Sequence, residues 1–565
     1  MSRRKPAIFW VLLALAVAVA IWWVLYVPYS EERLFGAIPA NARLVTVLDR
    51  PAQRLDSLLQ SPLFSGLLLS AGVREEDLQS LATDPDTRQW VRRLASHKVV
   101  LAQVPGLGTN AEPVWVGASW LGSSGHRLRW WLQAIGNKSF VSAHVEGATA
   151  VWVVRTRLSD PHLHLSVAIS DGLLLACISR DPIGVRYVLE THERYPWRPS
   201  VVSWKRLKTA RGLWHTQYPD RGWYLWPEAW RQPAFAPTLL AFEVNFPTAG
   251  GLAAEITADH DFPSGPAPAA DQSLNRLDRL IGSTPDLFIT APSSAVDLVL
   301  PESPSNPWIT AARQVLVDPQ RPDARVALCL LSREYVARIR GPLGSGLASL
   351  VKGLKVPSLL VAVERAAGAS AEPRIRSALD TLNGARHFGL VPHPVQFDGG
   401  GLTMIDETQK NLYAQFEPEE RISYAEADGW LLLCSNMSIL RRLLTEHGAA
   451  AAQAEAGARA TWALSGQPDA GTAVYACGNL RGAARTVSDA ISATLLVLLM
   501  RDAEGTQATR RQLAEVKGWI EPLRTLDQGW GSITPTGNVT HLALTLTAPP
   551  PETTVTHAAP QPPAR

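Results

Sequence analysis

Histidine pairs come closest in this chain to a catalytic or metal-binding spacing. His162 and His164 alternate, so a strand would place both on one face. A catalytic zinc site needs three protein ligands, and no third His or carboxylate stands at a matching spacing. His192 and His447 fall near expected helix C-termini, where they suit the exposed carbonyls. We therefore predict structural histidines and no metal site.

The nearest match to a nucleophile motif is S-x-x-K at Ser349 and Lys352. Its partner motifs S-D-N and K-T-G are missing from the sequence. The G-x-S-x-G, H-E-x-x-H, Walker A and G-x-G-x-x-G signatures are missing too. The sequence predicts no catalytic residue and no cofactor, which makes an enzyme the less favoured class.

Four cysteines, Cys177, Cys329, Cys434 and Cys477, each lie in or beside an apolar, strand-like run. They form no C-x-x-C pair and no zinc spacing. Buried free cysteine behaves as a small hydrophobic residue, and this is the expected role. A disulfide remains an alternative, because it needs only that two such strands lie close enough.

Tryptophan is concentrated between Tyr195 and Phe235, and prolines interrupt the same stretch. A looped excursion is expected there, and loops on a rigid scaffold often carry binding residues. We predict a binding surface at Trp214, Trp223, Trp226 and Trp230. The alternative is that these rings fill a core, because Trp is usually highly buried.

The N-terminal segment, which is expected to position the rest of the chain, is apolar. Residues Ala7 to Val27 carry no charge over 21 residues, enough for a helix to cross a bilayer. Arg3, Arg4 and Lys5 precede this run and predict a cytoplasmic N-terminus. We expect residues 1–6 in the cytoplasm, a transmembrane helix at 7–27, and the bulk of the chain in the periplasm of a bacterial inner membrane. A cleaved signal peptide is the alternative, although the run is long for one.

Composition is typical of a folded protein of several domains. The 565 residues are 46% hydrophobic and 19% charged, with a formal net charge of +3. The charges are spread along the chain, so no clustered basic face for nucleic acid is expected.

Two stretches of the chain match one another. Asp171-Gly, an apolar run containing Cys177, and a helical stretch ending at His192 match Asp428-Gly, Cys434 and His447. Asp-Gly is typical of a hairpin turn, and the apolar runs after it are strand-like. The upstream strands also correspond, and helices are expected near Arg127–Ile135 and Arg374–Leu382. Hairpins are expected at 247–250 and 535–538.

We therefore predict an α+β protein with two duplicated modules of mostly antiparallel sheet and packed helices behind the transmembrane helix. The modules cover residues 35–260 and 280–548, with a linker at 261–279 and a disordered Pro-rich tail at 549–565. The second module is expected to add helices at Leu480–Arg501 and Gln507–Leu526.

The Pro39-Ala-Asn-Ala opening and the Asp-Gly units resemble a bacterial family of single-anchored envelope proteins known only as a domain of unknown function. This resemblance implies duplicated modules but no activity. The sequence favours a membrane-anchored extracytoplasmic binding or scaffold protein with an envelope protein or cell-wall partner. An envelope hydrolase with an unrecognised active site and a lipid or hydrophobic-ligand carrier are the alternatives.

Overall fold

A computed structural model describes most of the chain after the apolar run. The described residues are 15, 26–70, 73–105, 114–135, 140–146, 149–155, 162–194, 218–225, 238–247, 250–259, 272–281, 285–300, 306–331, 358–366, 368–386, 388–398, 400–408, 418–453, 472–500, 506–536 and 539–549.

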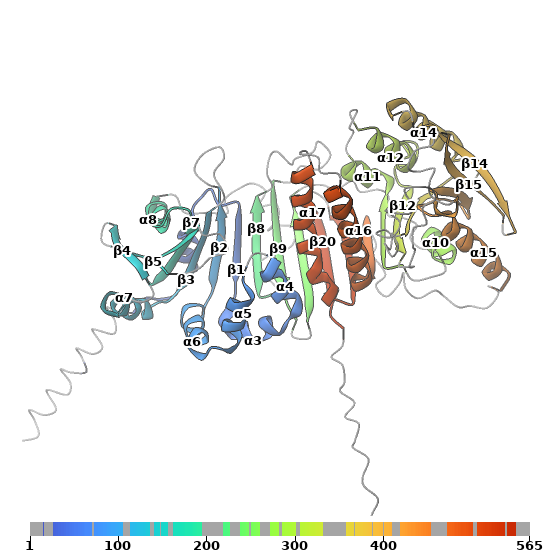
Figure 1. The fold of residues 1–565 in the computed structure, drawn as a ribbon. Coiled ribbons are helices and arrows are strands. Elements are labelled where there is room, and N and C mark those ends of the chain that lie inside the picture. The colour runs from blue at the N-terminus through green and yellow to red at the C-terminus, as the bar shows by residue number, and fades with distance from the viewer. Residues whose placement is uncertain are drawn as a thin grey trace, which may run out of the picture.

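Twenty strands account for most of the regular structure (Figure 1). They are β1 Leu44–Leu48, β2 Val99–Val104, β3 Val114–Trp120, β4 Phe140–Glu146, β5 Thr149–Val154, β6 His164–Ser170, β7 Leu173–Ser179, β8 Asp220–Leu225, β9 Leu239–Asn245, β10 Gly251–Ala258, β11 Leu287–Pro292, β12 Arg325–Leu331, β13 Ser358–Glu364, β14 Leu390–Phe397, β15 Gly400–Glu407, β16 Ser423–Ala427, β17 Trp430–Cys434, β18 Val474–Asn479, β19 Gln528–Thr536 and β20 Val539–Thr547.

Helices cover both faces of the sheet that these strands form. They are α2 Glu31–Gly36, α3 Pro51–Gln60, α4 Pro62–Ser70, α5 Glu75–Thr83, α6 Pro85–Leu94, α7 Ser124–Ile135, α8 Val185–Arg194, α10 Gln272–Ile281, α11 Ser293–Val299, α12 Pro307–Leu316, α14 Glu372–Arg386, α15 Met437–Gln453, α16 Leu480–Met500 and α17 Thr506–Ile520, with short 3-10 turns η4 Pro418–Glu420 and η5 Glu521–Thr525. The protein is thus a mixed α+β fold with a large antiparallel sheet.

The strand order in the two halves is the same. Hydrogen bonding runs β4-β5-β6-β7-β3-β2-β1-β8-β9-β10 in the first half. It runs β14-β15-β16-β17-β13-β12-β11-β18-β19-β20 in the second. Each strand of the first half therefore has one counterpart, ten labels later, at the same place in the second.

The register agrees with this correspondence. One cross-strand row of the first half is Ser166, Cys177, Val116, Ala102, Val45, Trp223, Ala241, Thr257. The matching row of the second half is Ser423, Cys434, Leu360, Cys329, Phe288, Cys477, Trp530, Thr545. Both rows begin with Ser and Cys and end with Thr.

Strands β10 and β20 join the halves at the centre of the sheet (Figure 1). Glu255 faces Ala543 across this pair, and the two row-ending residues, Thr257 and Thr545, each lie two positions further along their strands. The antiparallel seam therefore has an approximate two-fold axis at the Glu255–Ala543 pair.

Both Asp-Gly pairs form hairpin turns, as the sequence predicts. Asp171 and Asp428 each have φ of 48°, and the glycines that follow have φ of 76° and 81°. Two successive positive φ angles define the type I′ turn, whose twist suits a two-residue hairpin. The turns join β6 to β7 and β16 to β17, and α8 and α15 follow.

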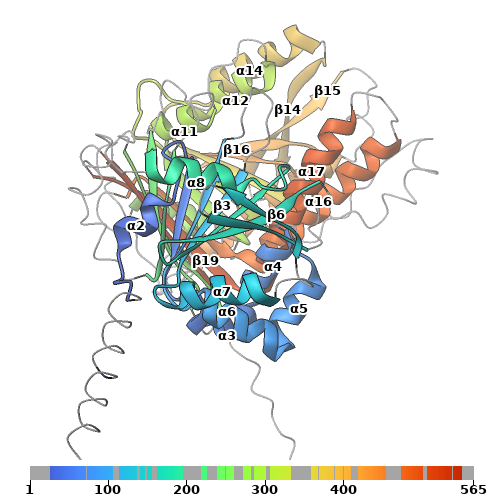
Figure 2. The ribbon, with the colours of Figure 1, turned by 90° about the vertical axis from the view of Figure 1, so that its left-hand side faces the viewer.

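Helices on one face of the sheet bury the two cross-strand rows described above, which we call the cysteine rows. In the first half, Leu34 of α2 and Val185 and Val188 of α8 share a core with Cys177. In the second half, α10 and α15 take these places over Cys329, Cys434 and Cys477. The opposite face carries α3 to α7 in the first half and α11, α12 and α14 in the second, as Figures 1 and 2 show.

Two expectations about the helices need correction. The predicted linker 261–279 contains the start of α10, whose Leu277, Leu280 and Ile281 are fully buried in the second core. The error arises because the amphipathic pattern of α10 follows directly after a Pro- and Ala-rich segment that is typical of a linker. His447 is not at a helix end, because α15 continues to Gln453 through a run of alanines that favours helix.

The four cysteines are free and buried. Leu360 lies between Cys329 and Cys434, and Phe288 lies between Cys329 and Cys477. Two strand spacings amount to roughly 10 Å, beyond the reach of a disulfide. Among the residues described, no helix is long and apolar enough to cross a membrane. Most of the expected anchor, and the tail from residue 550, lie outside them.

Candidate functional site

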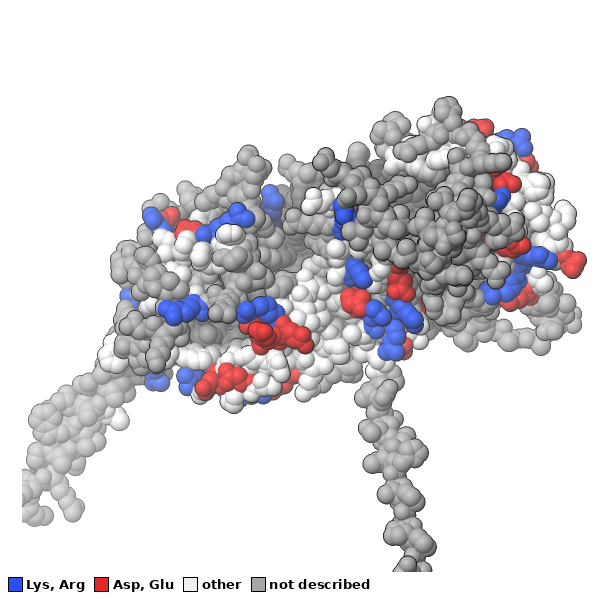
Figure 3. Space-filling model, in the orientation of Figure 1, with Lys and Arg blue, Asp and Glu red and all other residues white. Residues whose placement is uncertain are grey.

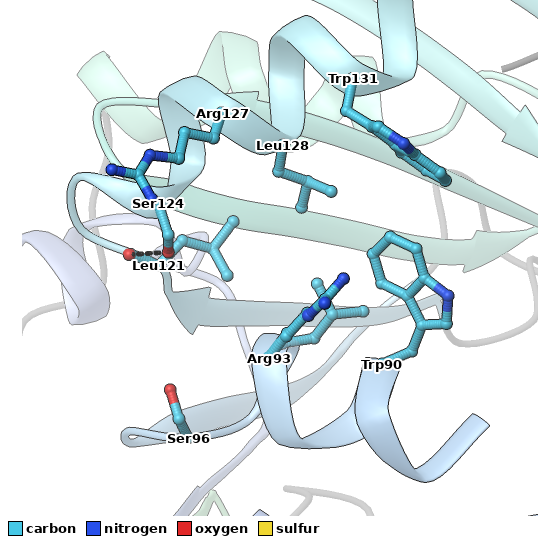
Figure 4. A pocket seen from close by; sticks show the side chains of 9 residues that line it. Trp90, Arg93, Ser96, Leu121, Ser124, Arg127, Leu128 and Trp131 are labelled. Atoms are coloured by element: carbon cyan, nitrogen blue, oxygen red, sulfur yellow. Dashed lines mark hydrogen bonds between the residues drawn. The ribbon is translucent and has the colours of Figure 1, made fainter. Parts of the chain in front are cut away.

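A cleft of about 590 Å³ separates α6 from α7 in the first half (Figure 4). Among the described residues, its lining is aromatic, aliphatic and cationic with two serines, and none of these residues is acidic. The lining residues are Trp90, Arg93, Leu94, Ser96, Leu121, Ser124, Arg127, Leu128 and Trp131.

Helix α6 owes its start to a side-chain cap and a proline. The Asp84 carboxylate accepts hydrogen bonds from the backbone N–H groups of Asp86 and Thr87, and Pro85 takes the first helical position. The Thr87 hydroxyl, together with these N–H groups, holds the pKa of Asp84 below its usual value. No residue of α6 is fully buried. The helix is therefore fixed by its cap and by polar contacts, including that of the Ser119 hydroxyl with the Leu94 carbonyl, and not by fully buried side chains.

Helix α7 packs on the sheet through one side only. Leu128 and Leu132 contact Trp152 and Ile169 in a small apolar cluster. Trp131 turns toward α6, where its ring centroid lies 4.9 Å from that of Trp90 (Figure 4). The next ring, Trp130, is 79% exposed. An aromatic pair at this separation is worth about 0.5–1.5 kcal/mol beyond burial, so it links two helices that otherwise stay apart.

The second half closes the corresponding space. Helices α12 and α14 occupy the places of α6 and α7, and Ala311, Val315, Ile375 and Ala378 meet there in one buried cluster. A hydrogen bond of 3.1 Å from Thr381 to Gln314 joins the same two helices.

Aligned helix starts explain why one space is open and the other closed. Helices α6 and α12 both have ten residues and begin with Pro after an Asx cap, at Asp84 and Asn306. This alignment sets Arg93 against the buried Val315. In the other helix pair, Arg127-Leu-Arg-Trp-Trp-Leu132 aligns with Arg374-Ile-Arg-Ser-Ala-Leu379. Trp131 then stands where the second half has the buried Ala378, so large side chains replace small ones on both walls.

One arginine differs between the halves in its partner. Arg374 donates to the Asp318 carboxylate at 3.2 Å and to the carbonyl of Val317, just after α12. The aligned first-half residues are Arg127 and, in place of Asp318, Ser96. No carboxylate of the described residues forms an ion pair with Arg127.

The cleft carries positive charge in its lining, from Arg93 and Arg127. On the face drawn in Figure 3, some Lys and Arg side chains lie beside Asp and Glu in mixed groups and others stand apart from them. In the cleft, the Arg93 guanidinium lies over the Trp90 ring at 5.5 Å from its centroid. Such a contact leaves the positive charge in place. The cleft therefore suits a ligand with a negative group and a flat or apolar part.

The sequence-predicted aromatic site is only partly described. Trp223 lies in β8, is 4% exposed and packs edge-on against Phe35 at 5.9 Å. It is a core residue, which corrects its assignment to a binding surface. The prediction was wrong because Trp223 lies in a half-buried strand, where alternate side chains point into the core. Trp214, Trp226 and Trp230 lie outside the described residues, so their role stays a prediction.

The remaining sequence candidates do not gather into a site. His164 lies at the start of β6, and among the described residues no three His, Cys, Asp or Glu side chains are placed to hold a metal. Ser349 and Lys352 lie outside the described residues. Trp90, Arg93 and Arg127 were not among the binding residues predicted from the sequence. Comparing the two arginine-rich helices residue by residue, at 127–135 and 374–382, could have singled out Trp131.

Comparison with known proteins returned nothing: no family model, no curated protein and no solved structure matches this chain.

Proposed function

We propose that this chain is a membrane-anchored binding protein built from two copies of one α+β module, with its ligand site in the α6–α7 cleft. The single observation that carries the proposal is that the cleft lies where the second half has a packed helix pair. The same strand order and register in both halves support a duplicated scaffold in which one copy has specialised.

The chemistry of the lining supports binding. Arg93 and Arg127 offer charge-assisted hydrogen bonds, and Trp90 and Trp131 offer flat apolar walls. Exposed aromatic and arginine side chains are the residue types that most often dominate binding energy. We place residues 7–27 in the bacterial inner membrane and the modules, at about 35–260 and 280–548, in the periplasm, on the charge asymmetry around the apolar run.

Photocrosslinking in the full chain, inside cells, tests the proposal. A photoreactive phenylalanine at position 131 should give a discrete adduct, because Trp131 faces the cleft at 40% exposure. The matched control is position 308, because Trp308 is 51% exposed on α12, the counterpart of α6, in the half without the cleft. Adducts at both positions, or at neither, would contradict a ligand site specific to the first half.

A further inference from the structure

The end of the apolar run is hydrogen-bonded to the residue just before α7, the helix that forms one wall of the cleft. The backbone N–H of Val27, its last residue, donates to the Ser123 hydroxyl at 3.2 Å, and α7 begins at Ser124. Two residues later, the Tyr29 ring packs edge-on against Trp120 at 5.3 Å. The described chain thus leaves the predicted bilayer directly beside the N-terminal end of α7.

One of the two cleft arginines, Arg127, lies at the end of the cleft near Val27. Ser96, Leu121 and Ser124 line that end, and Arg127 lies one helical turn beyond Ser124, with its guanidinium beside it in Figure 4. If residues 7–27 span the membrane, Val27 stands at headgroup level. Arg127 then stands near the same level, and the exposed ring of Trp130 suits the membrane interface as well.

From this arrangement we infer that the α6–α7 cleft binds the phosphate-bearing headgroup of an anionic phospholipid from the membrane that anchors the chain. The lipid phosphate takes the place at Arg127 that the Asp318 carboxylate takes at Arg374, and Ser96 leaves room for it. Trp90 and Trp131 then cover the glycerol and the first methylenes of the acyl chains. This inference rests on the proposed function, because it names the ligand of the same site.

The test uses the full chain in nanodiscs of phosphatidylcholine with or without phosphatidylglycerol. Hydrogen exchange of residues 85–94 and 124–135 should slow several-fold in the discs with phosphatidylglycerol. In neutral micelles, short-chain phosphatidylglycerol should bind, and Arg127→Gln should weaken it on the order of tenfold, as expected for the loss of one charge-assisted hydrogen bond.

The sharpest variant supplies the missing carboxylate. Ser96→Asp places a carboxylate at the position aligned with Asp318, where we expect it to pair with Arg127, so it should remove the phosphatidylglycerol effect without unfolding the helices. Ser377→Asp adds the same charge at an exposed position on α14 and should leave lipid binding unchanged. Equal losses in both variants would mean that only overall charge matters, and the inference would fail.

Two further outcomes overturn the inference while sparing the proposed function. Inorganic phosphate alone could slow exchange as much as the lipid does, which would identify a general anion site. The position-131 crosslink could join a protein while phosphatidylglycerol has no effect, which would identify a protein ligand. If position 131 captures nothing and neither lipid nor phosphate changes exchange, the proposed function fails as well.

Discussion

A matched pair of glycine substitutions tests whether the chain is held at the edge of the first module. Gly172 and Gly429 occupy the same position of the two type I′ turns, with φ of 76° and 81°. An alanine in this left-handed region costs about 1–2 kcal/mol in either turn. At Gly429 the nearest atom to a new methyl group is Nη1 of Arg276 at 3.7 Å, which is an ordinary contact.

At Gly172 the same methyl group meets a crowded site. It would lie 3.0 Å from Cγ1 of Val27, 3.1 Å from the carbonyl oxygen of Gly122 and 3.3 Å from the Gly122 Cα. Relief requires Val27 to move, which endangers its 3.2 Å hydrogen bond to Ser123, worth about 0.5–1.5 kcal/mol. Overpacking adds about 1–3 kcal/mol. Gly172→Ala should therefore cost about 1–3 kcal/mol more than Gly429→Ala.

Hydrogen exchange of the full chain in nanodiscs measures the local loss of stability that each substitution causes. The amides of β6 and β7 report on Gly172→Ala, and those of β16 and β17 report on Gly429→Ala. In addition, Gly172→Ala should speed exchange in the first turn of α7, where Gly429→Ala should not. Losses of protection that agree within about 0.5 kcal/mol would refute the contact between Val27 and the first module, and with it the membrane-proximal placement of the cleft.

Two further predictions concern the cysteine rows. Ser166→Ala should destabilise the first half by about 1–2 kcal/mol in urea titrations, because the Ser166 hydroxyl accepts the Val185 N–H at 2.9 Å. The aligned Ser423 hydroxyl is buried and has no hydrogen-bond partner among the described residues, so Ser423→Ala should be neutral or stabilising, and similar losses would contradict the comparison. Burial raises the pKa of Cys177 and of Cys434 to about 11, so neither thiol should react with iodoacetamide at pH 8 until the chain is unfolded. The folded pKa values of both thiols exceed the unfolded value of about 8.5. The stability that the protonated, buried thiols contribute is therefore complete below pH 8.5 and is lost as the pH rises toward 11. A denaturation midpoint that rises between pH 8.5 and 10.5 would disagree.

Local sequence signals predict the elements of this fold well. The Asp-Gly pairs locate the β6–β7 and β16–β17 hairpins, and apolar runs around the cysteines locate four strands. The expected helix near Arg374–Leu382 is α14, Glu372–Arg386. Each of these signals depends on residues a few positions apart, so periodicity and turn chemistry suffice.

Long-range pairing and the cleft could not be predicted in the same way. The seam joins Gly251–Ala258 to Val539–Thr547. The alternating apolar pattern of each strand predicts a strand but does not indicate which other strand it pairs with. Helix α6 carries no fully buried residue, so its position depends on contacts such as the Trp90–Trp131 pair, the Arg88–Asp56 ion pair and the hydrogen bond from Ser119 to the Leu94 carbonyl.

The open cleft also has an energetic consequence for the folded chain. Where the second half buries Val315 between two helices, the first half has the exposed Arg93, and it forgoes about 1.5–3 kcal/mol of apolar burial at that position. A ligand that binds only the folded chain contributes about 2.7 kcal/mol at a hundredfold excess over its Kd. The two magnitudes are similar, so an occupied cleft can restore the stability that the missing helix contact removes. Without ligand, α6 has no fully buried side chain and is held mainly by its cap, polar contacts such as that of Ser119 with the Leu94 carbonyl, and the Trp90–Trp131 contact, so it should be the first helix of the first half to open.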